Sequence, residues 1–325
     1  MNKETIETFI GNKALVIGDV MVDKYLTGKI DRISPEAPVP IVNLQTREAR
    51  LGGAANVTLS LKALEAEPIL FSIVGDDQNG ELIKHLLEEQ NISAENIQSS
   101  TTRKTTVKSR ILSSNQQILR VDEEDTHPLD KKEEKLLLNS ISSYLDKESV
   151  AVIIFQDYNK GVLTPLLIKT IITLAKRKNI PTVVDPKKDN FWAYEGVTCF
   201  KPNIKEVREA LNKAIQIDKE SLYEIHHDLR QKLDHKASLI TLSEHGIFYA
   251  DAKENHLIAT QSRKIADVCG AGDAVLAVVA LGLANEISAP VLCDLANLAG
   301  GQVCEKVGVV PVEKSQLCRE LSKSS

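Results

Sequence analysis

The sequence predicts an α/β fold, a three-layer α/β/α sandwich with a mostly parallel central sheet. Two observations predict it. Short, continuous apolar runs that end in a polar residue recur along the chain, and stretches typical of helices lie between them. A strand that is apolar along its whole length is buried on both faces, and parallel strands joined by helices are covered in this way. We therefore expect one layer of strands between two layers of helices.

The individual elements follow from this alternation of apolar runs and helical stretches. Five apolar runs predict strands at 14–19, 69–76, 151–157, 181–185 and 238–244. The intervening stretches predict helices at 53–64, 80–89, 164–178 and 274–284. Ligands of parallel sheets bind beyond the carboxyl ends of the strands, so the polar residues closing the runs should share one rim. These residues are Asp19, Asp76, Asp157, Asp185, Asn203 and Glu244. Carboxylates and amides on one rim suit a polyol and a metal-bound nucleotide.

Two segments, 22–45 and 103–121, interrupt the alternation and are typical of exposed strands. Three prolines in the first segment exclude it from the centre of a sheet. We interpret both segments as a small β-lid inserted in a single domain that spans residues 1–325. The alternative is an ordinary pair of edge hairpins. Exposed strand edges can pair with a second copy, so we expect a homodimer closed through the lid.

Composition excludes several classes of function. The net charge is −5 and the charges are scattered, so no basic surface is expected for nucleic acid or an anionic membrane. The longest apolar run, 274–284, is far shorter than the ~20 residues that span a bilayer, and no signal-peptide core follows the N-terminus. We expect a cytoplasmic protein that binds small molecules or other proteins.

The cysteines and histidines do not predict a metal site. The five cysteines include no C-x-x-C pair, so reduced, mostly buried thiols are expected. His226-His227-Asp228 is the one cluster of metal-ligating side chains, but adjacent side chains on a helix do not face each other. A solvated helix surface is the favoured interpretation, and we predict no metal cage built from protein ligands.

A glycine-containing turn, Asp267-Val-Cys-Gly-Ala-Gly-Asp273, runs directly into the apolar stretch 274–284. After Gly270, the unpaired amides of Ala271, Gly272 and Asp273 and the positive end of the helix dipole should converge there and attract an anion. Asp273 is the candidate general base, because its carboxylate can accept a proton from an attacking hydroxyl. The alternative is a helix entry with Asp in its first turn, and the heptapeptide by itself does not decide between the two.

Other phosphate and nucleophile motifs are missing. Gly75-Asp-Asp-Gln-Asn-Gly80 has the glycine spacing of a phosphate loop, but Glu81 stands where the lysine is needed. Gly270-Ala-Gly272 begins like a dinucleotide fingerprint, but Val275 occupies the third glycine position. No G-x-S-x-G elbow is present. Hydride transfer and hydrolysis are therefore disfavoured.

Three motifs in order resemble the ribokinase-like (phosphofructokinase-B-type) sugar kinases. They are Leu51-Gly-Gly-Ala-Ala-Asn-Val57, Lys201-Pro-Asn-Ile-Lys-Glu206 and the glycine turn. The resemblance implies a ribokinase-like fold with ATP and Mg²⁺ as cofactors. It implies that Gly52, Gly53 and Asn56 contact the sugar. Asn203 and Glu206 would organise water and Mg²⁺ around the phosphates.

Further segments narrow the resemblance to kinases that phosphorylate D-glycero-D-manno-heptose 7-phosphate at C1. They are Gly18–Asp23, Arg32–Pro40, Asn115–Gln117 with Arg120, Asp157–Gly161 and Asp185–Lys187. The match implies a β-1,7-bisphosphate product on the way to ADP-heptose for the lipopolysaccharide core. Bifunctional members continue into a nucleotidyltransferase domain, so the chain resembles a stand-alone kinase or a kinase half. Three positions depart from the family pattern. Cys269 stands where Thr is expected, Lys201 stands where a small residue is expected, and Asn159 stands where Ala is expected.

The resemblance also assigns the remaining site residues. Sugar hydroxyls would contact Asp19 and Asp23 as well as Gly53 and Asn56. Candidates for holding the distal phosphate are Lys108, Arg110 and Arg120 in the lid, with Lys160 or Lys187 on the rim. ATP would contact Asn203, Glu206, Ser243, Gly246 and Asp267, with adenine toward the helix of Asn297. Two alternatives stay open: a kinase for another sugar or nucleoside, such as ribose or fructose, and a non-catalytic sugar-nucleotide sensor on the same fold.

Overall fold

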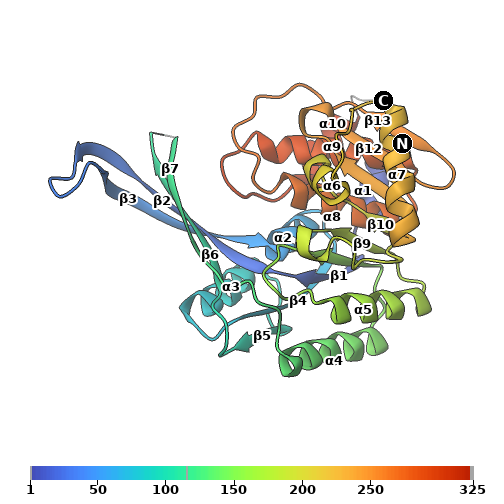
Figure 1. The fold of residues 1–325 in the computed structure, drawn as a ribbon, viewed down its shortest axis with the longest axis horizontal. Coiled ribbons are helices and arrows are strands. Elements are labelled where there is room, and N and C mark those ends of the chain that lie inside the picture. The colour runs from blue at the N-terminus through green and yellow to red at the C-terminus, as the bar shows by residue number, and fades with distance from the viewer. Residues whose placement is uncertain (1, 115, 323–325) are drawn as a thin grey trace.

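The computed structural model describes residues 2–114 and 116–322, so Asn115, one of the residues carrying the resemblance, lies outside the described residues. A mostly parallel sheet runs through the body of the molecule in the order β13-β12-β11-β10-β9-β8-β1-β4-β5 (Figure 1). Its strands are β1 Lys13–Gly18, β4 Glu67–Gly75, β5 Ile97–Ser100, β8 Val152–Gln156, β9 Thr182–Asp185, β10 Cys199–Phe200, β11 Ala237–Thr241, β12 Ile247–Ala250 and β13 Asn255–Ile258. The strands from β11 to β5 are parallel, and β12 and β13 form an antiparallel edge. The predicted fold class is confirmed.

Helices cover both faces of this central sheet. They are α1 Asn2–Glu7, α2 Ala54–Ala63, α3 Gln78–Glu89, α4 Lys131–Lys147, α5 Pro165–Arg177, α6 Ile204–Leu211, α7 Lys219–Leu233, α8 Ala271–Ala284, α9 Ala289–Cys304 and α10 Lys314–Leu321. Side chains alternate across β1: Ala14 and Val16 join the core beneath α2, α8 and α9, whereas Leu15 and Ile17 join the core beneath α4, α5 and α7. This alternation is the period of two that a strand buried on both faces requires. Each predicted strand and helix is present to within three residues at its ends.

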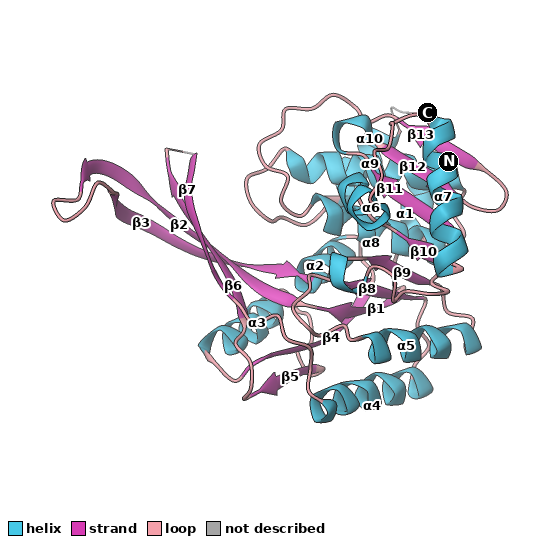
Figure 2. Cartoon of the chain, in the orientation of Figure 1, coloured by secondary structure: helices cyan, strands magenta, loops and turns pink. Residues whose placement is uncertain are grey.

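The two segments predicted as exposed strands form a second sheet of four strands, which we call the outer sheet. Its order is β3-β2-β6-β7, with β2 Val20–Ile33, β3 Pro40–Gly53, β6 Thr106–Ser113 and β7 Gln116–Glu123. Figure 2 shows the outer sheet projecting away from the body of the molecule. Its base is buried, since β2 follows β1 directly and β3 runs into α2, and its tip is exposed, as is the whole of β7. The sheet therefore extends over a longer stretch of chain than 22–45 and 103–121.

One prediction on the helices was wrong. His226 does not lie on a solvated surface: it is buried on α7, and its Nδ1 lies 2.9 Å from Ser238 Oγ on β11. It lies four residues after Leu222 and three before Leu229, so it shares the apolar face of the helix, whereas His227 points to solvent. The thiols follow the prediction: the cysteines are free, and Cys199, Cys293 and Cys304 are buried. No helix in the described ranges is long and apolar enough to cross a membrane.

Candidate active site

A large cavity, of about 900 Å³, lies beyond the carboxyl ends of β9 to β11, at the N-terminus of α8. Strand β12, the 260–265 loop and α9 contribute its far wall. Four parts of the chain that are distant in sequence thus line one space, as expected for a ligand site of a parallel sheet. Of the predicted site residues, the cavity lining includes Asn203, Ser243, Gly246, Gly270, Ala271, Gly272, Asp273 and Asn297.

The glycine turn forms one end of this cavity. Gly270 has φ +81°, a left-handed conformation that favours glycine, and α8 begins at the next residue. A Cβ at Gly270 would also lie 3.0 Å from Asn56 Nδ2. The first helical hydrogen bond runs from the Ala274 amide to the Gly270 carbonyl at 3.0 Å, so the amides of Gly272 and Asp273 precede the ladder and face an anion at the helix terminus.

The amide of Ala271 differs from the prediction. It donates a long hydrogen bond, 3.4 Å, to the carbonyl of Val268, because the turn closes on itself one residue before the helix. Two of the three predicted amides at the α8 terminus, those of Gly272 and Asp273, are therefore left for a ligand.

Asp273 is held by three side-chain donors from three different elements. Its Oδ2 accepts from Asn56 Nδ2 at 2.7 Å, and its Oδ1 accepts from Gln156 Nε2 and from the Tyr158 hydroxyl, both at 3.0 Å. The side chain is almost completely buried. Burial raises the pKa of this carboxyl to about 6, although the hydrogen bonds from Asn56 and Tyr158 favour its charged form. A carboxylate whose pKa lies close to neutral is suited to accept a proton.

Two buried acceptors beside Asp273 lack a partner. Asn56 Oδ1 and Gln156 Oε1 have no hydrogen-bond partner in the described part of the chain, although the amide nitrogens of the same side chains bind Asp273. Leaving a buried acceptor unpaired costs free energy, so such atoms mark places where a ligand supplies the donor. Hydroxyl groups of a polyol are donors of this kind.

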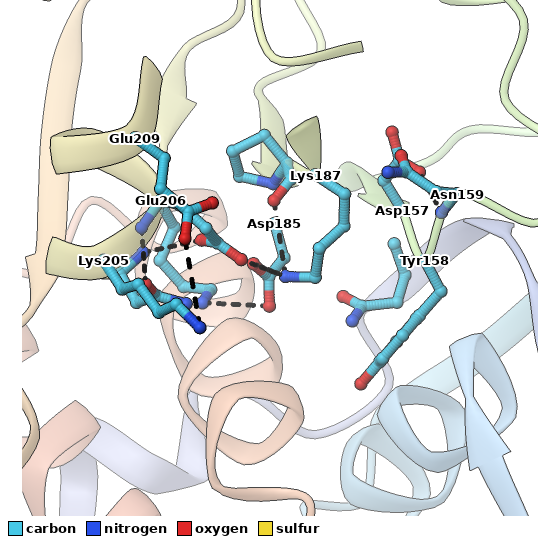
Figure 3. A network of polar contacts seen from close by, with 12 residues as sticks. Asp157, Tyr158, Asn159, Asp185, Lys187, Lys205, Glu206 and Glu209 are labelled. Carbon is cyan, nitrogen blue, oxygen red and sulfur yellow. Dashed lines mark hydrogen bonds and ion pairs between the residues drawn. The ribbon is translucent and has the colours of Figure 1, made fainter. Parts of the chain in front are cut away.

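A chain of alternating charges includes Asp185, Lys187 and Glu206, which Figure 3 shows, and Asp185 and Lys187 line the same cavity as Asp273. Asp185 pairs with Lys201 at 3.1 Å and with Lys187 at 3.3 Å, and Lys187 also bonds to Glu206. Burial disfavours the charge on Asp185, but the two ammonium groups outweigh it and lower the pKa of this carboxyl. Burial raises the pKa of Glu206, with Asp185 adding to the effect. Lysines, carboxylates and helix amides together form a surface on which phosphates and their counter-ion can be neutralised.

The carboxylates of this chain fit a magnesium ion that is carried in by a nucleotide. Mg²⁺ is usually bound through one or two carboxylates together with phosphate oxygens and water. Glu206 and Asp185 supply two carboxylates near the cavity, and no group of three or more His, Cys, Asp or Glu side chains converges among the described residues. Glu206 Oε2 also accepts from the Asn203 amide at 2.8 Å while Asn203 caps α6, which fixes both residues at the start of that helix.

One residue assigned to the nucleotide lies elsewhere. Asp267 is not part of the cavity lining: its Oδ1 accepts from the Cys269 amide at 3.1 Å and its Oδ2 from the Gly308 amide at 3.0 Å. Its carboxylate therefore joins the glycine turn to the loop after α9 and stabilises the turn from outside the cavity.

The residues assigned to the sugar lie at the base of the outer sheet. Asp23 on β2 forms an ion pair with Arg110 on β6, and a Cβ at Gly52 would lie 2.1 Å from the Asp23 carboxylate. Gly53 has φ +62° and begins α2, which places Asn56 one turn later against Asp273. The glycines thus let β3 pass close to Asp23 and turn into the helix that carries Asn56.

Asp19 is bound by backbone amides of one loop. Its carboxylate accepts from the amides of Tyr158, Lys160 and Val162 at 2.8–3.1 Å, and it does not belong to the large cavity. Burial, together with Asp157, raises the pKa of Asp19 to about 6. Since both oxygens accept hydrogen bonds from one loop, Asp19 holds the 157–162 loop in place, and its assignment to the sugar hydroxyls stays a prediction.

The five cations assigned to a distal phosphate differ in their availability, and Lys187 is paired with Asp185 and Glu206. Arg110 is paired with Asp23, Lys160 with Glu124 at 2.8 Å, and the exposed Arg120 with Asp122 at 2.9 Å. Lys108 is different: its ammonium lies 5.2 Å from the ring centroid of Tyr158, and no carboxylate in the described ranges is within ion-pairing distance. Burial lowers the pKa of Lys108, as expected for a cation that lacks a close counter-ion.

Sequence reasoning did not assign Gln156, Tyr158 or Lys201 to the site. Gln156 is the last residue of β8 and Tyr158 follows two residues later, so both lie at the carboxyl edge of the sheet where ligands bind. Lys201 follows the buried strand β10 and is itself 2% exposed. A lysine directly after a buried apolar strand is the signal that could have marked it, because such a charge needs a buried partner.

Comparison with known proteins supports the resemblance to carbohydrate kinases. A family model described as pfkB family carbohydrate kinase matches residues 12–315. The chain is 40% identical over 323 residues to a bifunctional protein HldE of Syntrophotalea carbinolica, covering 98% of this chain and 65% of the relative. It is 38% identical to a bifunctional protein HldE of Geobacter sulfurreducens, covering 99% of this chain and 66% of that protein. The chain thus spans about two thirds of the length of these relatives.

Solved structures show the same fold at low sequence identity. Phosphofructokinase-2 of Escherichia coli, in complex with potassium, superposes with a TM-score of 0.79 at 18% identity over 96% of this chain and 99% of that one. Ribokinase of Arabidopsis thaliana, complexed with ribose and ATP, superposes with a TM-score of 0.74 at 16% identity over 97% and 100% of the two chains. The architecture is therefore ribokinase-like.

Proposed function

Because the chain belongs to the pfkB family of carbohydrate kinases and is an ATP-dependent sugar kinase, we propose that it phosphorylates D-glycero-β-D-manno-heptose 7-phosphate at C1. The observation that carries the proposed chemistry is the buried Asp273 carboxylate at the α8 terminus, with unpaired acceptors of Asn56 and Gln156 beside it. The heptose motifs of the sequence and the near-complete match to bifunctional HldE proteins support the substrate.

The reacting hydroxyl lies between Asp273 and the γ-phosphate of ATP in this proposal. Asn56 Oδ1 and Gln156 Oε1 accept hydrogen bonds from sugar hydroxyls and orient the ring. The anomeric oxygen forms a bond to the γ-phosphorus, the bond from that phosphorus to the ADP oxygen breaks, and Asp273 receives the hydroxyl proton. Phosphoryl transfer depends mainly on position and charge neutralisation, which this arrangement supplies.

The transferring phosphoryl group meets donors on the side of α8. The amides of Gly272 and Asp273 and the ammonium of Lys201 border the same end of the cavity. Mg²⁺ bound with ATP would neutralise the phosphate oxygens, and Glu206 and Asp185 are the carboxylates that would hold it through water. Lys187, which bonds to both of these carboxylates here, is then available for a phosphate oxygen.

The 7-phosphate is proposed to bind Lys108 first. Among the five assigned cations, Lys108 is the one with no carboxylate within ion-pairing distance in the described chain, and it lies beside the cavity residue Tyr158. Arg110 contributes from the same strand while it stays paired with Asp23. A phosphate between these two residues would replace the missing counter-ion of Lys108.

A substrate panel tests the proposal. The purified protein is given Mg-ATP with heptose 7-phosphate, fructose 6-phosphate, ribose, fructose or adenosine, and ADP release is followed. We expect turnover of heptose 7-phosphate at least tenfold above that of the unphosphorylated sugars, with a new anomeric phosphate seen by ³¹P NMR. Equal turnover of free ribose or fructose would contradict the heptose assignment. Binding of sugar and ATP without any transfer would support a sensor instead.

We also propose that the protein works in the cytoplasm as a homodimer closed through the outer sheet. The support is the run of exposed apolar side chains on its edge strand β7, of which Leu119 is 54% and Val121 is 44% exposed. Apolar side chains on an exposed strand edge favour pairing with a second copy. Sedimentation of the parent protein and of Leu119→Glu tests this proposal, because the charge should shift the equilibrium to monomers.

A further inference from the structure

We infer that Tyr158 is a positioning residue that holds the Asp273 carboxylate and links its orientation to the two lysines that meet the substrate phosphates, an inference that rests on the proposed function. Three contacts of one side chain carry it. The hydroxyl donates to Asp273 Oδ1 at 3.0 Å, and the ring contacts Lys108 from β6 and Lys187 from the loop after β9.

The hydroxyl contact differs from the other two contacts of Asp273. Gln156 lies on β8 and is fully buried, and Asn56 is fully buried on α2, so the surrounding elements fix both amides. Tyr158 is partly exposed, lines the large cavity and lies in a loop. Of the three donors to Asp273, it is the one whose residue lines this cavity.

The backbone of Tyr158 is fixed even though its ring borders the cavity. Its amide donates to Asp19 Oδ2 at 2.8 Å, and the amides of Lys160 and Val162 bond to the same carboxylate. Asp19 thus anchors the loop from below. Movement of Tyr158 is consequently confined to its side chain, which connects the cavity to the base.

The ring contacts come from both sides of the proposed reaction. The ammonium of Lys108 lies 5.2 Å from the ring centroid and belongs to the outer sheet, where the sugar phosphate is proposed to bind. The ammonium of Lys187 lies 5.7 Å from the same centroid and is paired with Glu206 and Asp185 on the nucleotide side. Both distances are within the range of a cation–π contact. Figure 3 shows Lys187 reaching toward Asp185.

These contacts give the side chain a defined role. A substrate phosphate that draws either lysine changes what the ring contacts, and the hydroxyl of the same ring donates to the base. The hydroxyl favours the charged form of Asp273, the form that accepts a proton. Tyr158 therefore keeps Asp273 in the charged form that accepts a proton. It also makes the orientation of this carboxylate depend on the sugar phosphate and on the nucleotide phosphates.

The first test compares Tyr158→Phe with Tyr194→Phe. Tyr194 is a buried tyrosine whose hydroxyl also donates to a carboxylate, that of Asp157, at 2.7 Å, so the control removes a bond of the same kind away from Asp273. For Tyr158→Phe we expect the acid limb of the kcat/KM profile to move up by about half to one pH unit, because a donor to a charged acceptor is lost. The Tyr194→Phe profile should keep the limb of the parent. An unmoved limb in Tyr158→Phe, or equal shifts in both variants, overturns the role.

The second test separates the ring from the hydroxyl. Tyr158→Leu removes both, and we expect it to raise KM for the phosphorylated sugar about threefold or more above the value of Tyr158→Phe, since the contact to Lys108 is lost. Tyr158→Phe itself should leave that KM within twofold of the parent. Equal KM values in both variants would overturn the link to the lysines.

The third test needs no substrate, so failure of the proposed function does not affect it. Thermal unfolding is measured from pH 5 to pH 8 for the parent, Tyr158→Phe, Asp273→Asn and the double variant. Tyr158→Phe should cost more stability at pH 8, where Asp273 is charged, than at pH 5, and this pH dependence should vanish in the Asp273→Asn background. A cost that is independent of pH, or that persists in the double variant, overturns the inference even if the enzyme phosphorylates another sugar.

Discussion

Asp273 and Asp185 lie in one cavity and are both buried, yet their environments push the two carboxyl groups in opposite directions. Asp273 is held by neutral donors, and burial raises its pKa to about 6. Asp185 contacts two lysine ammonium groups, which lower its pKa despite burial. In the proposed mechanism, one residue type therefore serves as the proton acceptor at the glycine turn and as a charged group near the nucleotide phosphates, according to its neighbours.

The largest effect is expected at the proton acceptor. Asp273→Asn should lower kcat by about 10²–10⁴-fold, because general-base catalysis is worth roughly that much. Binding of Mg-ATP should change by less than about threefold, since the α8 amides remain. Steady-state kinetics and calorimetric titration with a non-hydrolysable ATP analogue measure the two quantities. A near-normal kcat would contradict the proposed difference in role between Asp273 and Asp185.

Lys201→Met tests the ion pair between Lys201 and Asp185. Lys201 is fully buried against Asp185, and removing one partner leaves a buried carboxylate that retains only Lys187. We expect a loss of about 3–5 kcal/mol in the free energy of unfolding at pH 7, measured by urea denaturation. The double variant with Asp185→Asn should lose less than the sum of the single losses. Additive losses would show that the two groups do not interact.

A third prediction concerns Lys108 of the outer sheet. Lys108→Met should raise KM for the phosphorylated sugar by about tenfold, which corresponds to roughly 1.4 kcal/mol of binding, and leave KM for ATP within twofold. Arg120→Met is the matched control, because Arg120 is exposed and paired with Asp122. Initial-rate kinetics with each substrate varied separately distinguish the two variants. Equal KM values would remove Lys108 from the phosphate site.

The smallest effect concerns stability. The folded-state pKa of Asp273, about 6, lies above its ordinary value of 3.8, so the folded protein loses stability as pH rises between these values. Asp273→Asn lacks this charge and should be more stable than the parent at pH 8 by about 1–3 kcal/mol. The advantage should shrink as pH falls toward 4. Denaturant unfolding at several pH values measures it, and a variant less stable at every pH would contradict the burial argument.

The buried histidines give the opposite pH dependence. Burial lowers the pKa of His226 to about 4 and that of His235 to about 3, and both rings bond to Ser238. Because these values lie below the ordinary 6.5, the unfolded chain binds the protons first, and stability is lost as pH falls from 6.5. His226→Gln should flatten the decline between pH 6.5 and 4.5. An unchanged decline would mean that other groups cause it.

Much of the fold was predictable because it depends on local pattern. Apolar runs and glycine placement are properties of neighbouring residues, and they located the central strands and the turn before Asp273. The antiparallel edge, β12 and β13, was missed because its strands have four residues each and no alternation long enough to recognise.

The site was less predictable because it depends on which side chains meet across elements. Gln156 and Tyr158 contact Asp273 although both lie more than a hundred positions from it in the sequence, and no local pattern specifies these contacts. Asp19 ends a strand as a rim residue should, but three loop amides capture its carboxylate. Polarity at a strand end therefore predicts the neighbourhood of the site and leaves the direction of each side chain undetermined.

The most direct measurement of the central claim is the pH dependence of kcat/KM for the phosphorylated sugar in the parent and in Asp273→Asn. The account predicts a parent rate that falls with unit slope below about pH 6, the pKa of the buried carboxyl. It predicts a low rate without this limb in the variant. A limb near pH 6 that persists at full height in Asp273→Asn would contradict the assignment of Asp273 as the base.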